Sequence, residues 1–596
     1  MKQRTLLQLA IALAALILLV GIALAQVPPP PAAAPTAASG SNAASGKRGS
    51  LSGRVLGDDG EPVEGATVMV MAMNRDRAGS RTLATDADGN FKANNLPATT
   101  FVVTATVPGY VDAQGGMPQA VMQNSTQRYR LGENITLTMV KGGAITGKVL
   151  DAAGQPLVGA PVFAIRARDG DGRPVAETLM TNQLRTTDDR GVYRLWGMQA
   201  GSYLIYTTGA GELYSLMSGG REVPTYYPNA TRDTAQEVMV TAGAETQGID
   251  IRHRGDMGHA VSGTVVGMAE ASSTGQSIVA IDLLQLSTGT RIATTSVNAR
   301  TGNGFALYGV ADGEYELVAQ QRSFSSGQNE GSWMAVPRRV TVRGGDVPGI
   351  EMRLAPLGLI AGRVVLEKLE KTDCPITRRG ELEELLLVPR REDKEVRRGS
   401  LNFVTQDATP NDKGEFAVRD LEPGRYRLTS QLPSDHWYIK ALTLPAPARA
   451  AAAKPAALSF AASGLTLKSG EKLSGVTMAL AEGAAAVNGR LEGKKPAARM
   501  RIFLVPAEKE AADDVLRYHE VVTRDTGFVF QHLAPGKYWL HARAVLDDES
   551  DETPAKPVAW NSTERAKLRQ AAETANQTIE LTTCQRVKDF ALKLAK

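Results

Sequence analysis

At 596 residues the chain is too long for one globular core, and roughly four to six domains of about 100 to 150 residues are expected. Lys and Arg number 67 against 63 Asp and Glu, and this net charge of +4 argues against a dedicated nucleic-acid surface. The 59 glycines and 30 prolines, with short Val and Thr runs between them, are typical of many short strands joined by turns.

The N-terminus has the features of a targeting segment. Lys2 and Arg4 precede an almost wholly apolar stretch, residues 6–25, which ends in the small-x-small sequence Ala23-Leu24-Ala25. This pattern predicts a signal peptide over 1–25, followed by a disordered Pro/Ala/Ser linker over 26–49. About 20 apolar residues can also span a bilayer, so a retained membrane anchor is the alternative. Either way we expect export from the cytoplasm, to the periplasm, the cell surface or the surroundings, with membrane contact only if this helix is retained.

A short phrase (apolar, small, Gly, any residue, Val or Leu) recurs along the chain. Its glycines are Gly53, Gly147, Gly263, Gly362 and Gly489, which lie 94, 116, 99 and 127 residues apart by subtraction. Each phrase alternates apolar and other residues, as a half-buried opening strand does. We therefore predict an all-β chain, a tandem array of about five immunoglobulin-like or transthyretin-like β-sandwiches. Their predicted bounds are 50–141, 142–256, 257–356 (divergent), 357–482 and 483–596.

Further phrases mark the interior of each repeat. An Asx-rich turn, a glycine and an aromatic residue predict a hairpin, as in Asp88-Gly89-Asn-Phe91. A Gly-x-Tyr phrase follows, and we interpret its tyrosine as a buried, hydrogen-bonded core residue. The tyrosines in question are Tyr203, Tyr315, Tyr426 and Tyr538, and Phe101 takes this place in the first repeat.

Insertions interrupt the two last repeats. A charged stretch covers 368–398 and an Ala/Pro tract covers 445–457. Residues 561–575 have a helical pattern, because Asn561 and Glu564 match a capping box and Leu568 and Ala572 share a face.

These phrases resemble the carboxypeptidase regulatory-like domain. The shared pattern is Gly-x-Val, Gly-x-Pro-Leu/Val-x-Gly-Ala-x-Val, Thr-Asp-x-x-Gly-x-Phe/Tyr and Pro-Gly-x-Tyr-x-Leu. The first two repeats match well, the last two fairly and the third poorly, since it lacks the Gly-x-Pro phrase. Residues 225–251 are similar to a region of long secreted multi-repeat members from soil bacteria. The resemblance implies a transthyretin-like or starch-binding-like sandwich and an accessory or binding module without catalytic residues.

Searches for catalytic, metal-binding and cofactor-binding patterns give no site. None of the six histidines lies in a His-x-x-Glu or His-Glu-x-x-His arrangement, so a zinc peptidase is not expected. His253 and His259 are spaced so that they can chelate a metal, but solvated loop residues are the commoner interpretation. Residues 142–149 nearly spell a phosphate-binding loop, yet Val149 replaces its Ser or Thr. The acidic residues of 547–552 lack the spacing of a calcium loop.

The remaining candidates are aromatic residues and two cysteines. Ligand-contact aromatics outside the strand phrases are Tyr226, Tyr227, Trp333, Trp437 and Tyr438, with Trp560 as a further candidate. A structural role is the favoured interpretation of each, because aromatics make up only 5% of the chain and most of them are needed in cores. Cys374 and Cys584 either form one disulfide in an oxidising compartment or remain two separate buried thiols.

The sequence thus favours a non-catalytic exported protein that binds a polysaccharide or an envelope or extracellular protein through loops of its sandwiches. A structural spacer or stalk of the cell envelope is the alternative, and accessory modules of a peptidase system are a third. No nucleic acid, cofactor or catalytic residue is expected.

Overall fold

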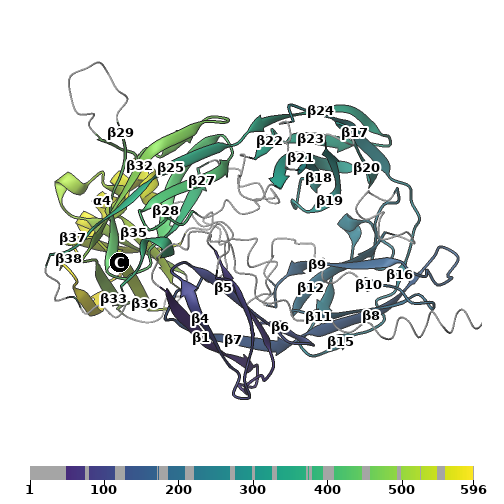
Figure 1. The fold of residues 1–596 in the computed structure, drawn as a ribbon, viewed down its shortest axis with the longest axis horizontal. Coiled ribbons are helices and arrows are strands. Elements are labelled where there is room, and N and C mark those ends of the chain that lie inside the picture. Colours follow the sequence, from purple (N-terminus) through teal and green to yellow (C-terminus); the bar gives the residue numbers. More distant parts are fainter. Residues whose placement is uncertain are drawn as a thin grey trace, which may run out of the picture. The chain divides into compact units, whose positions relative to one another are not determined.

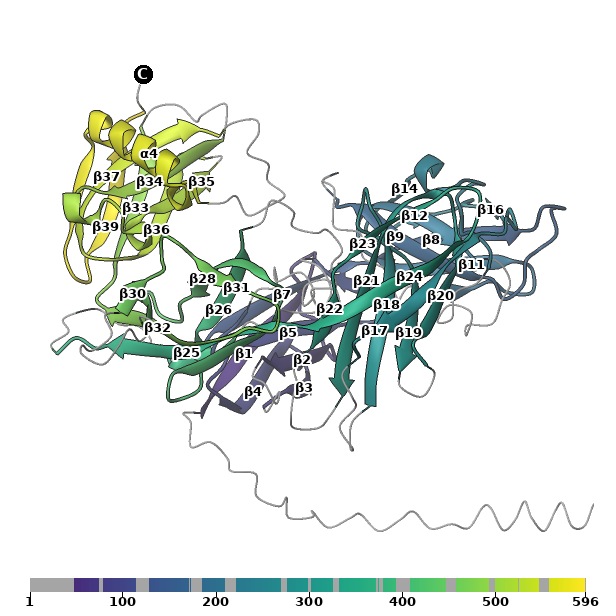
Figure 2. The same ribbon diagram turned by 90° about the horizontal axis from the view of Figure 1, so that it is seen from above.

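The chain is described from a computed structural model (Figures 1 and 2). The structure describes residues 48–73, 79–113, 128–170, 172, 185–208, 221–268, 276–298, 302–324, 332–370, 374, 379–392, 408–445, 457–492, 499–523, 525–545 and 557–594. The predicted signal peptide, the linker up to residue 47 and the acidic residues 547–552 lie outside this part of the chain. Within it, no helix has the length and apolar character needed to cross a membrane.

Strands dominate the described residues and form tandem β-sandwiches, which confirms the predicted fold class. In Figures 1 and 2 the strands of each sandwich lie together in one range of colour. The first sandwich has the sheets β4-β1-β7-β6 and β3-β2-β5. Its strands are β1 (Arg48–Gly57), β2 (Thr67–Ala72), β3 (Arg81–Ala84), β4 (Asn90–Pro97), β5 (Phe101–Thr106), β6 (Tyr110–Asp112) and β7 (Asn134–Lys141).

The second sandwich pairs the sheet β10-β9-β12-β13, extended by β14, with the sheet β11-β8-β15, extended by β16. Its elements are β8 (Gly143–Leu150), β9 (Pro161–Arg168), β10 (Arg185–Thr186), β11 (Val192–Met198), β12 (Gly201–Thr207), β13 (Thr225–Tyr226), η2 (Arg232–Thr234), β14 (Val238–Val240), β15 (Glu245–Thr246) and β16 (Ile251–Arg252).

The third sandwich differs, because its strands form one continuous sheet in the order β19-β18-β21-β22-β24-β17-β20, with β23 paired to β21. Strand β22 pairs with both β21 and β24 and so joins the two layers. The strands are β17 (His259–Val266), β18 (Gln276–Gln285), β19 (Arg291–Asn298), β20 (Gly304–Val310), β21 (Gly313–Phe324), β22 (Trp333–Ala335), β23 (Arg338–Val342) and β24 (Val347–Pro356).

The fourth sandwich has the sheets β27-β25-β32-β29-β30 and β26-β28-β31. Its elements are β25 (Gly358–Glu367), η3 (Leu382–Glu384), β26 (Leu386–Arg391), β27 (Glu415–Leu421), β28 (Gly424–Gln431), β29 (Trp437–Pro445), β30 (Ala457–Ser459), β31 (Leu465–Leu467) and β32 (Lys472–Glu482).

The fifth sandwich has the sheets β36-β33-β39 and β35-β34-β37-β38. Its elements are β33 (Ala485–Leu491), β34 (Met500–Pro506), η4 (Lys509–Ala511), η5 (Val515–Arg517), β35 (His519–Thr523), β36 (Gly527–Leu533), β37 (Gly536–Ala544), η6 (Val558–Trp560), α4 (Ser562–Ala575), β38 (Thr578–Leu581) and β39 (Arg586–Leu592).

Each sandwich has a separate hydrophobic core. The core clusters draw their buried residues from 51–139, 145–251, 261–354, 360–480 and 485–592. The second and fifth sandwiches each have a further small cluster, which includes Phe163 and Tyr206 in the second and Phe503 and Leu568 in the fifth. Leu516 of the fifth sandwich also packs against the core of the fourth.

The glycine of the repeated opening phrase is required by close approach of the closing strand. Strand β8 runs parallel to β16, and a Cβ atom on Gly147 would lie 1.9 Å from the carbonyl oxygen of Ile249. The equivalent distances at Gly53, Gly263 and Gly362 are 2.3, 1.8 and 2.0 Å. A side chain at these positions would collide with backbone, so glycine follows from the sheet geometry.

The Asx-glycine turns and the repeated tyrosines behave as the sequence predicts. The Oδ1 atom of Asp188 accepts from the backbone N–H groups of Arg190 and Val192, and Gly191 has a φ of 72°. Each of the four tyrosine hydroxyls donates to a carbonyl four residues upstream, at 2.7–2.9 Å, from a side chain that is at most 5% exposed. The prediction of buried, hydrogen-bonded tyrosines is confirmed.

The predicted helix is present as α4. The Asn561 side chain accepts from the backbone N–H groups of Thr563 and Glu564, as an N-cap residue does. Leu568 and Ala572 are buried in a small cluster with β34. The helix therefore covers the outer face of the β35-β34-β37-β38 sheet.

Candidate functional site

Every sandwich has a β-bulge at the same place, on the strand that follows the Asx-glycine turn. Here the pairing with the opening strand shifts by one residue and the backbone turns to positive φ. The positive-φ residues are Asn95 (56°), Gly197 (68°), Gly309 (67°), Asp420 (58°) and His532 (59°). The residues directly after them return to the core and are at most 1% exposed: Leu96, Met198, Val310, Leu421 and Leu533.

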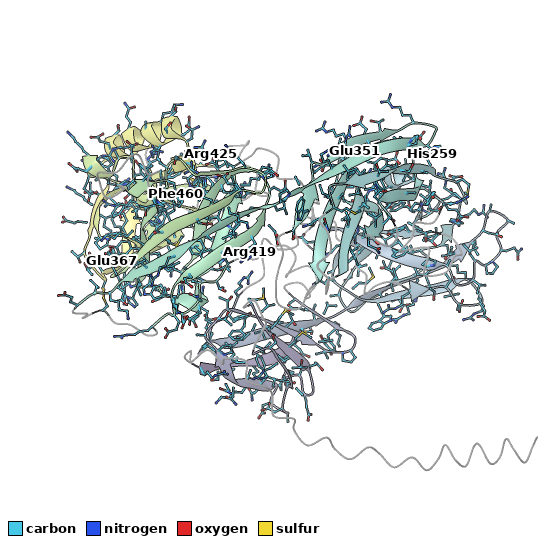
Figure 3. All side chains as sticks on the ribbon, turned by 45° about the horizontal axis from the view of Figure 1, so that its top comes forward. His259, Glu351, Glu367, Arg419, Arg425 and Phe460 are labelled. Carbon is cyan, nitrogen blue, oxygen red and sulfur yellow. A yellow bond between two sulfur atoms is a disulfide. The ribbon has the colours of Figure 1, made fainter. Side chains whose placement is uncertain are left out.

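The residue before each bulge lies on the outer face of its strand. In the second and third sandwiches it is aromatic and strongly exposed, Trp196 at 45% and Tyr308 at 37%. In the other sandwiches it is Asn94, Arg419 or Gln531 (Arg419 is labelled in Figure 3). Two sandwiches in succession therefore present an aromatic ring at the same structural position.

Trp196 belongs to a polar and aromatic surface on the β11-β8-β15 sheet. The Arg185 guanidinium lies over its ring, 5.0 Å from the ring centroid. Arg194, two residues earlier on the same face, forms a 2.9 Å ion pair with Glu245 of β15. This hydrogen bond from Arg194 lowers the pKa of Glu245, which keeps the carboxylate ionised. Ala144 stands in register between Trp196 and Glu245.

Tyr308 has a comparable partner. The Arg221 guanidinium lies 5.7 Å from its ring centroid. Arg221 is held in place by its carbonyl oxygen, which accepts from the Gly258 N–H at 2.8 Å. We name the two clusters, Trp196 with Arg185, Arg194 and Glu245, and Tyr308 with Arg221, the aromatic–arginine faces.

Neither Trp196 nor Tyr308 is among the ligand-contact aromatics expected from the sequence, because those candidates were aromatics outside the strand phrases. The period-2 alternation of β11 is the sequence pattern that indicates the exposure of Trp196. Tyr193 and Leu195 are core residues, so Arg194 and Trp196 must point the other way.

Two of the predicted ligand-contact aromatics are buried instead. Tyr226 is 5% exposed and packs against Tyr206, with the rings tilted by 31° and their centroids 5.0 Å apart. Trp437 is 4% exposed and belongs to the fourth core. Neither ring has a free face for a ligand, so these two candidates are corrected to core residues.

The other candidates are partly buried. Tyr227 packs against the second core and Trp333 against the third. Tyr438 lies on β29, where burial raises the pKa of its hydroxyl. Trp560 stacks on Arg427, with the guanidinium carbon 4.9 Å from the ring centroid.

His253 and His259 do not come together as metal ligands. His253 is 7% exposed and its ring bonds to Thr225 and Glu222, at 3.2 and 2.9 Å. His259 instead forms a 3.3 Å pair with Asp312. The expectation of solvated loop residues is corrected for His253, which is buried. Residues 143–150, which include most of the near-match to a phosphate loop, form strand β8.

The junction of the fourth and fifth sandwiches is held by covalent and polar contacts. Cys374 and Cys584 form a disulfide, with Cα atoms 5.5 Å apart and 210 residues between them in sequence. The His532 ring donates from Nδ1 to the carbonyl of Trp437 at 3.0 Å.

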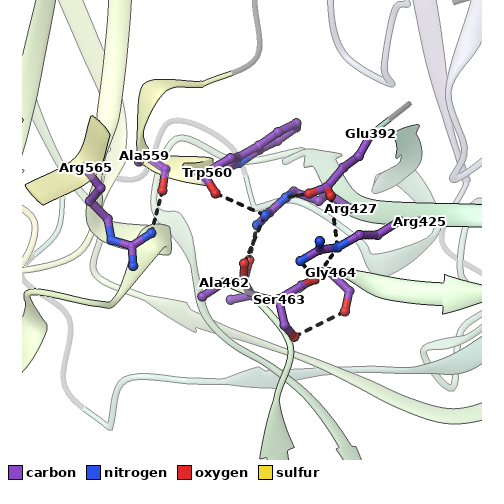
Figure 4. Close-up of polar contacts among 10 residues, drawn as sticks. Glu392, Arg425, Arg427, Ala462, Ser463, Gly464, Ala559, Trp560 and Arg565 are labelled. Carbon is purple, nitrogen blue, oxygen red and sulfur yellow. Dashed lines mark hydrogen bonds and ion pairs between the residues drawn. The ribbon is translucent and has the colours of Figure 1, made fainter. Parts of the chain in front are cut away.

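Arg427 forms a second link across the same junction (Figure 4). It is paired with Glu392 and donates to the carbonyl oxygens of Ala461 and Ala462, at 2.7 and 2.9 Å, and of Trp560, at 3.4 Å. Because its side chain is only 6% exposed, these acceptors satisfy a buried charge. Arg427 therefore ties a loop of the fourth sandwich to η6 of the fifth.

The comparisons with known proteins agree with the resemblance for one sandwich. The model of the carboxypeptidase regulatory-like domain family matches residues 50–137, which is the first sandwich. The matched description is that of a regulatory-like domain. No curated protein matches the chain.

Several solved structures, pilins among them, are similar to parts of the chain. The Bacillus anthracis TIE protein is 15% identical, covers 51% of this chain and 51% of its own, and has a TM-score of 0.14. A streptococcal ancillary pilin is 18% identical over 35% of this chain and 63% of its own, with a TM-score of 0.18. The minor pilin GBS52 of Streptococcus agalactiae is 12% identical over 38% and 99%, with a TM-score of 0.19. The chain spans about half the length of the TIE protein.

Proposed function

We propose that the chain is an exported, non-catalytic scaffold that binds a polysaccharide through its aromatic–arginine faces. The observation that carries this proposal is the recurrence of an exposed aromatic ring at one structural position in two successive sandwiches, with a guanidinium against each ring. Arg185 comes from the same sandwich as Trp196, whereas Arg221, against Tyr308 of the third sandwich, comes from the second. Export is supported by the apolar N-terminal segment and its small-x-small end.

The chemistry of the Trp196 face suits a sugar. An exposed indole offers a flat apolar surface for the C–H face of a pyranose ring. Arg194 and Glu245 beside it supply donors and acceptors for hydroxyl groups, and few but well-placed polar groups are what gives a binding site its specificity. A charged aromatic surface of this kind suits a hydroxyl-rich ligand better than an apolar one.

The presence of two aromatic–arginine faces on one chain favours a polymer as the ligand. Two weak sites on one chain bind a repetitive polymer more tightly than either site alone, because the second contact is intramolecular. A polysaccharide satisfies this condition with one repeating unit for each face.

A structural spacer of the cell envelope is the second candidate. It is favoured by the disulfide and the Arg427 contacts, which link two adjacent sandwiches. One chain can both bind a polysaccharide and act as a structural spacer, and retention on immobilised polysaccharides tests the binding role separately.

The test is retention of the full chain on immobilised polysaccharides, with Trp196→Ala and Tyr308→Ala variants. We expect each substitution to weaken retention about 10-fold, the loss typical of an aromatic anchor, and the double variant to lose most of it. Trp196→Phe should keep most of the binding. Gln531→Ala, at the equivalent position of the fifth sandwich, is the matched control and should bind as wild type.

Two results would contradict the binding proposal and leave the spacer. One is the absence of retention on any polysaccharide tested; the other is equal retention of wild type and double variant. Capture of a protein partner that is lost in Trp196→Ala would reassign the same faces to a protein ligand. Mass analysis of the chain recovered outside the cytoplasm tests export, since cleavage after Ala25 gives a mature chain that starts at Gln26.

A further inference from the structure

Three metal-ligating side chains meet at the junction of the fourth and fifth sandwiches. One ligand atom from each of Cys374, His436 and Cys584 lies within 4.8 Å of the other two. The three residues come from separate segments: Cys374 follows β25, His436 precedes β29, and Cys584 lies between β38 and β39. Tertiary structure alone brings them together.

The backbone around the three residues is firmly held. The carbonyl oxygen of His436 accepts from the N–H groups of Gly483 and Ala484, at 2.8 and 2.9 Å. The Cys584 N–H donates to the Gly483 carbonyl at 2.9 Å. His436 is 6% exposed, so its ring is fixed inside the junction. These bonds connect both sandwiches at the segment between β32 and β33 and do not involve the disulfide.

The donor set suits a thiophilic ion. Two thiolates and one imidazole are ligands of Zn²⁺ and of Cu⁺, with Zn–S near 2.3 Å and Zn–N near 2.0–2.1 Å. Ligand atoms around such a tetrahedral ion are roughly 3 to 4 Å apart. Separation of the two sulfur atoms after reduction, with the backbone retained, is enough to reach this geometry, and a water completes the fourth position.

We propose that Cys374, Cys584 and His436 form a site with two states, a disulfide when oxidised and a Zn²⁺ site when reduced. A dithiol reductant breaks the S–S bond and leaves two thiols while it becomes a disulfide itself. Zn²⁺ then replaces the two thiol protons and forms two Zn–S bonds. The link between the sandwiches persists in both states, and the proposal does not depend on polysaccharide binding.

A substitution of Arg586 can test whether the three residues bind a metal in addition to forming a covalent link. The Arg586 guanidinium lies 3.4 Å from Nδ1 of His436 and donates to the Asp435 carbonyl at 3.2 Å. A fixed positive charge beside the imidazole opposes a cation there. Arg586→Gln is therefore expected to tighten metal binding several-fold.

The experiment uses the full chain, reduced with dithiothreitol under argon, desalted, and titrated with Co²⁺ and then Zn²⁺. We expect about one Co²⁺ per chain, with sulfur-to-cobalt charge-transfer absorbance that Zn²⁺ removes. The oxidised chain should show none. His436→Ala should bind at least 10-fold more weakly, and Cys374→Ser with Cys584→Ser should lose the absorbance.

The comparison of oxidised and reduced wild type needs no variant, so a folding defect does not decide the outcome. Circular dichroism of the double serine variant checks that its sandwiches remain folded. The proposal is overturned if the reduced wild type takes up no more metal than that variant. It is also overturned if His436→Ala and Arg586→Gln both leave the affinity unchanged, because the metal then binds elsewhere.

Discussion

The second and third sandwiches use the repeated bulge differently from the fourth and fifth. Gly197 and Gly309 have no side chain, and the residues before them are the exposed Trp196 and Tyr308. In the fourth sandwich Asp420 occupies the bulge, and its Oδ1 accepts from the Ser332 N–H of the third sandwich at 3.0 Å. In the fifth, His532 bonds to Trp437 of the fourth.

The same bulge geometry thus occurs in two structural settings, and they differ in the side chain of the positive-φ residue. The positive φ is present in both pairs and can be supplied by glycine, Asp or His. A glycine places no side chain at the bulge, and the neighbouring ring is exposed. A polar side chain reaches across and fastens its sandwich to the preceding one.

All the bulges share a buried core residue directly after the positive-φ position, and we predict that this residue contributes to stability in both pairs of sandwiches. Met198 and Leu421 are 1% and 0% exposed, so Met198→Ala and Leu421→Ala should each cost about 2 to 5 kcal/mol. Hydrogen exchange of the amides in the altered sandwich measures this loss as a local unfolding free energy. Val365→Ala, at a 43% exposed position, should change it by less than about 0.5 kcal/mol. A cost below about 1 kcal/mol in either sandwich would show that the bulge does not anchor its core.

Acid should destabilise the fifth sandwich more than the second. Burial lowers the pKa of His519 to about 4, and the nearby His532 and Arg517 oppose its protonation further. Its buried Nε2 has no hydrogen-bond partner among the described residues. Above pH 6.5 the ring is neutral in both the folded and unfolded states. Between pH 6.5 and 4 only the unfolded state takes up the proton, so stability falls as pH falls.

The loss is at most about 3 kcal/mol and levels off below pH 4. Hydrogen exchange of the fifth sandwich at pH 7 and pH 4.5, corrected for the intrinsic exchange rate, measures it. His519→Gln should remove most of the difference between the two pH values. If wild type and His519→Gln respond alike, His519 is not the group responsible.

Local patterns in the sequence were enough to predict the tandem sandwiches. The glycine phrases, Asx turns and buried tyrosines each depend on neighbouring residues and on a period of two. The pairing of opening and closing strands is parallel and joins distant residues, from Gly53 with Ile135, 82 positions apart by subtraction, to Gly362 with Val476, 114 positions apart. Such pairings leave no local signal beyond the glycine. In the third sandwich, β22 is too short for its alternation to predict that it joins the two layers.

The exposure or burial of single aromatic residues was harder to predict, for a different reason. Tyr226 lies in the two-residue strand β13, so no alternation indicates that its ring is buried. Trp196 lies in a seven-residue strand where alternation does indicate exposure, yet aromatic residues in strands are usually core residues. The proximity of Cys374 and Cys584 depends on how two sandwiches meet, which a spacing of 210 residues does not reveal.

The positive φ of the glycine bulge can be tested at Gly197. A Cβ atom on Gly197 would have open space within 4 Å, so substitution there costs only the positive φ. Gly197→Val should cost about 1 to 2 kcal/mol and Gly197→Asn clearly less, because Asn tolerates this conformation. Gly345→Val is the control, since Gly345 also has open space but no positive φ. Thermal and hydrogen-exchange measurements on the sandwich that carries each substitution, the second for Gly197 and the third for Gly345, should rank the variants in this order. Equal costs for Val and Asn at Gly197 would count against a backbone origin.

The smallest expected effect is on the junction of the third and fourth sandwiches. Asp420→Gly keeps the positive φ but removes the acceptor of the Ser332 N–H, at a cost of about 1 kcal/mol. Asp420→Asn keeps both the conformation and an oxygen acceptor, so it should stay close to wild type. The measurement is the exchange rate of the Ser332 amide, which should rise in Asp420→Gly while amides inside β27 remain protected. Unchanged protection of Ser332 would mean that the Asp420 side chain does not fasten the junction. Faster exchange throughout β27 would instead assign Asp420 to the stability of its own sandwich.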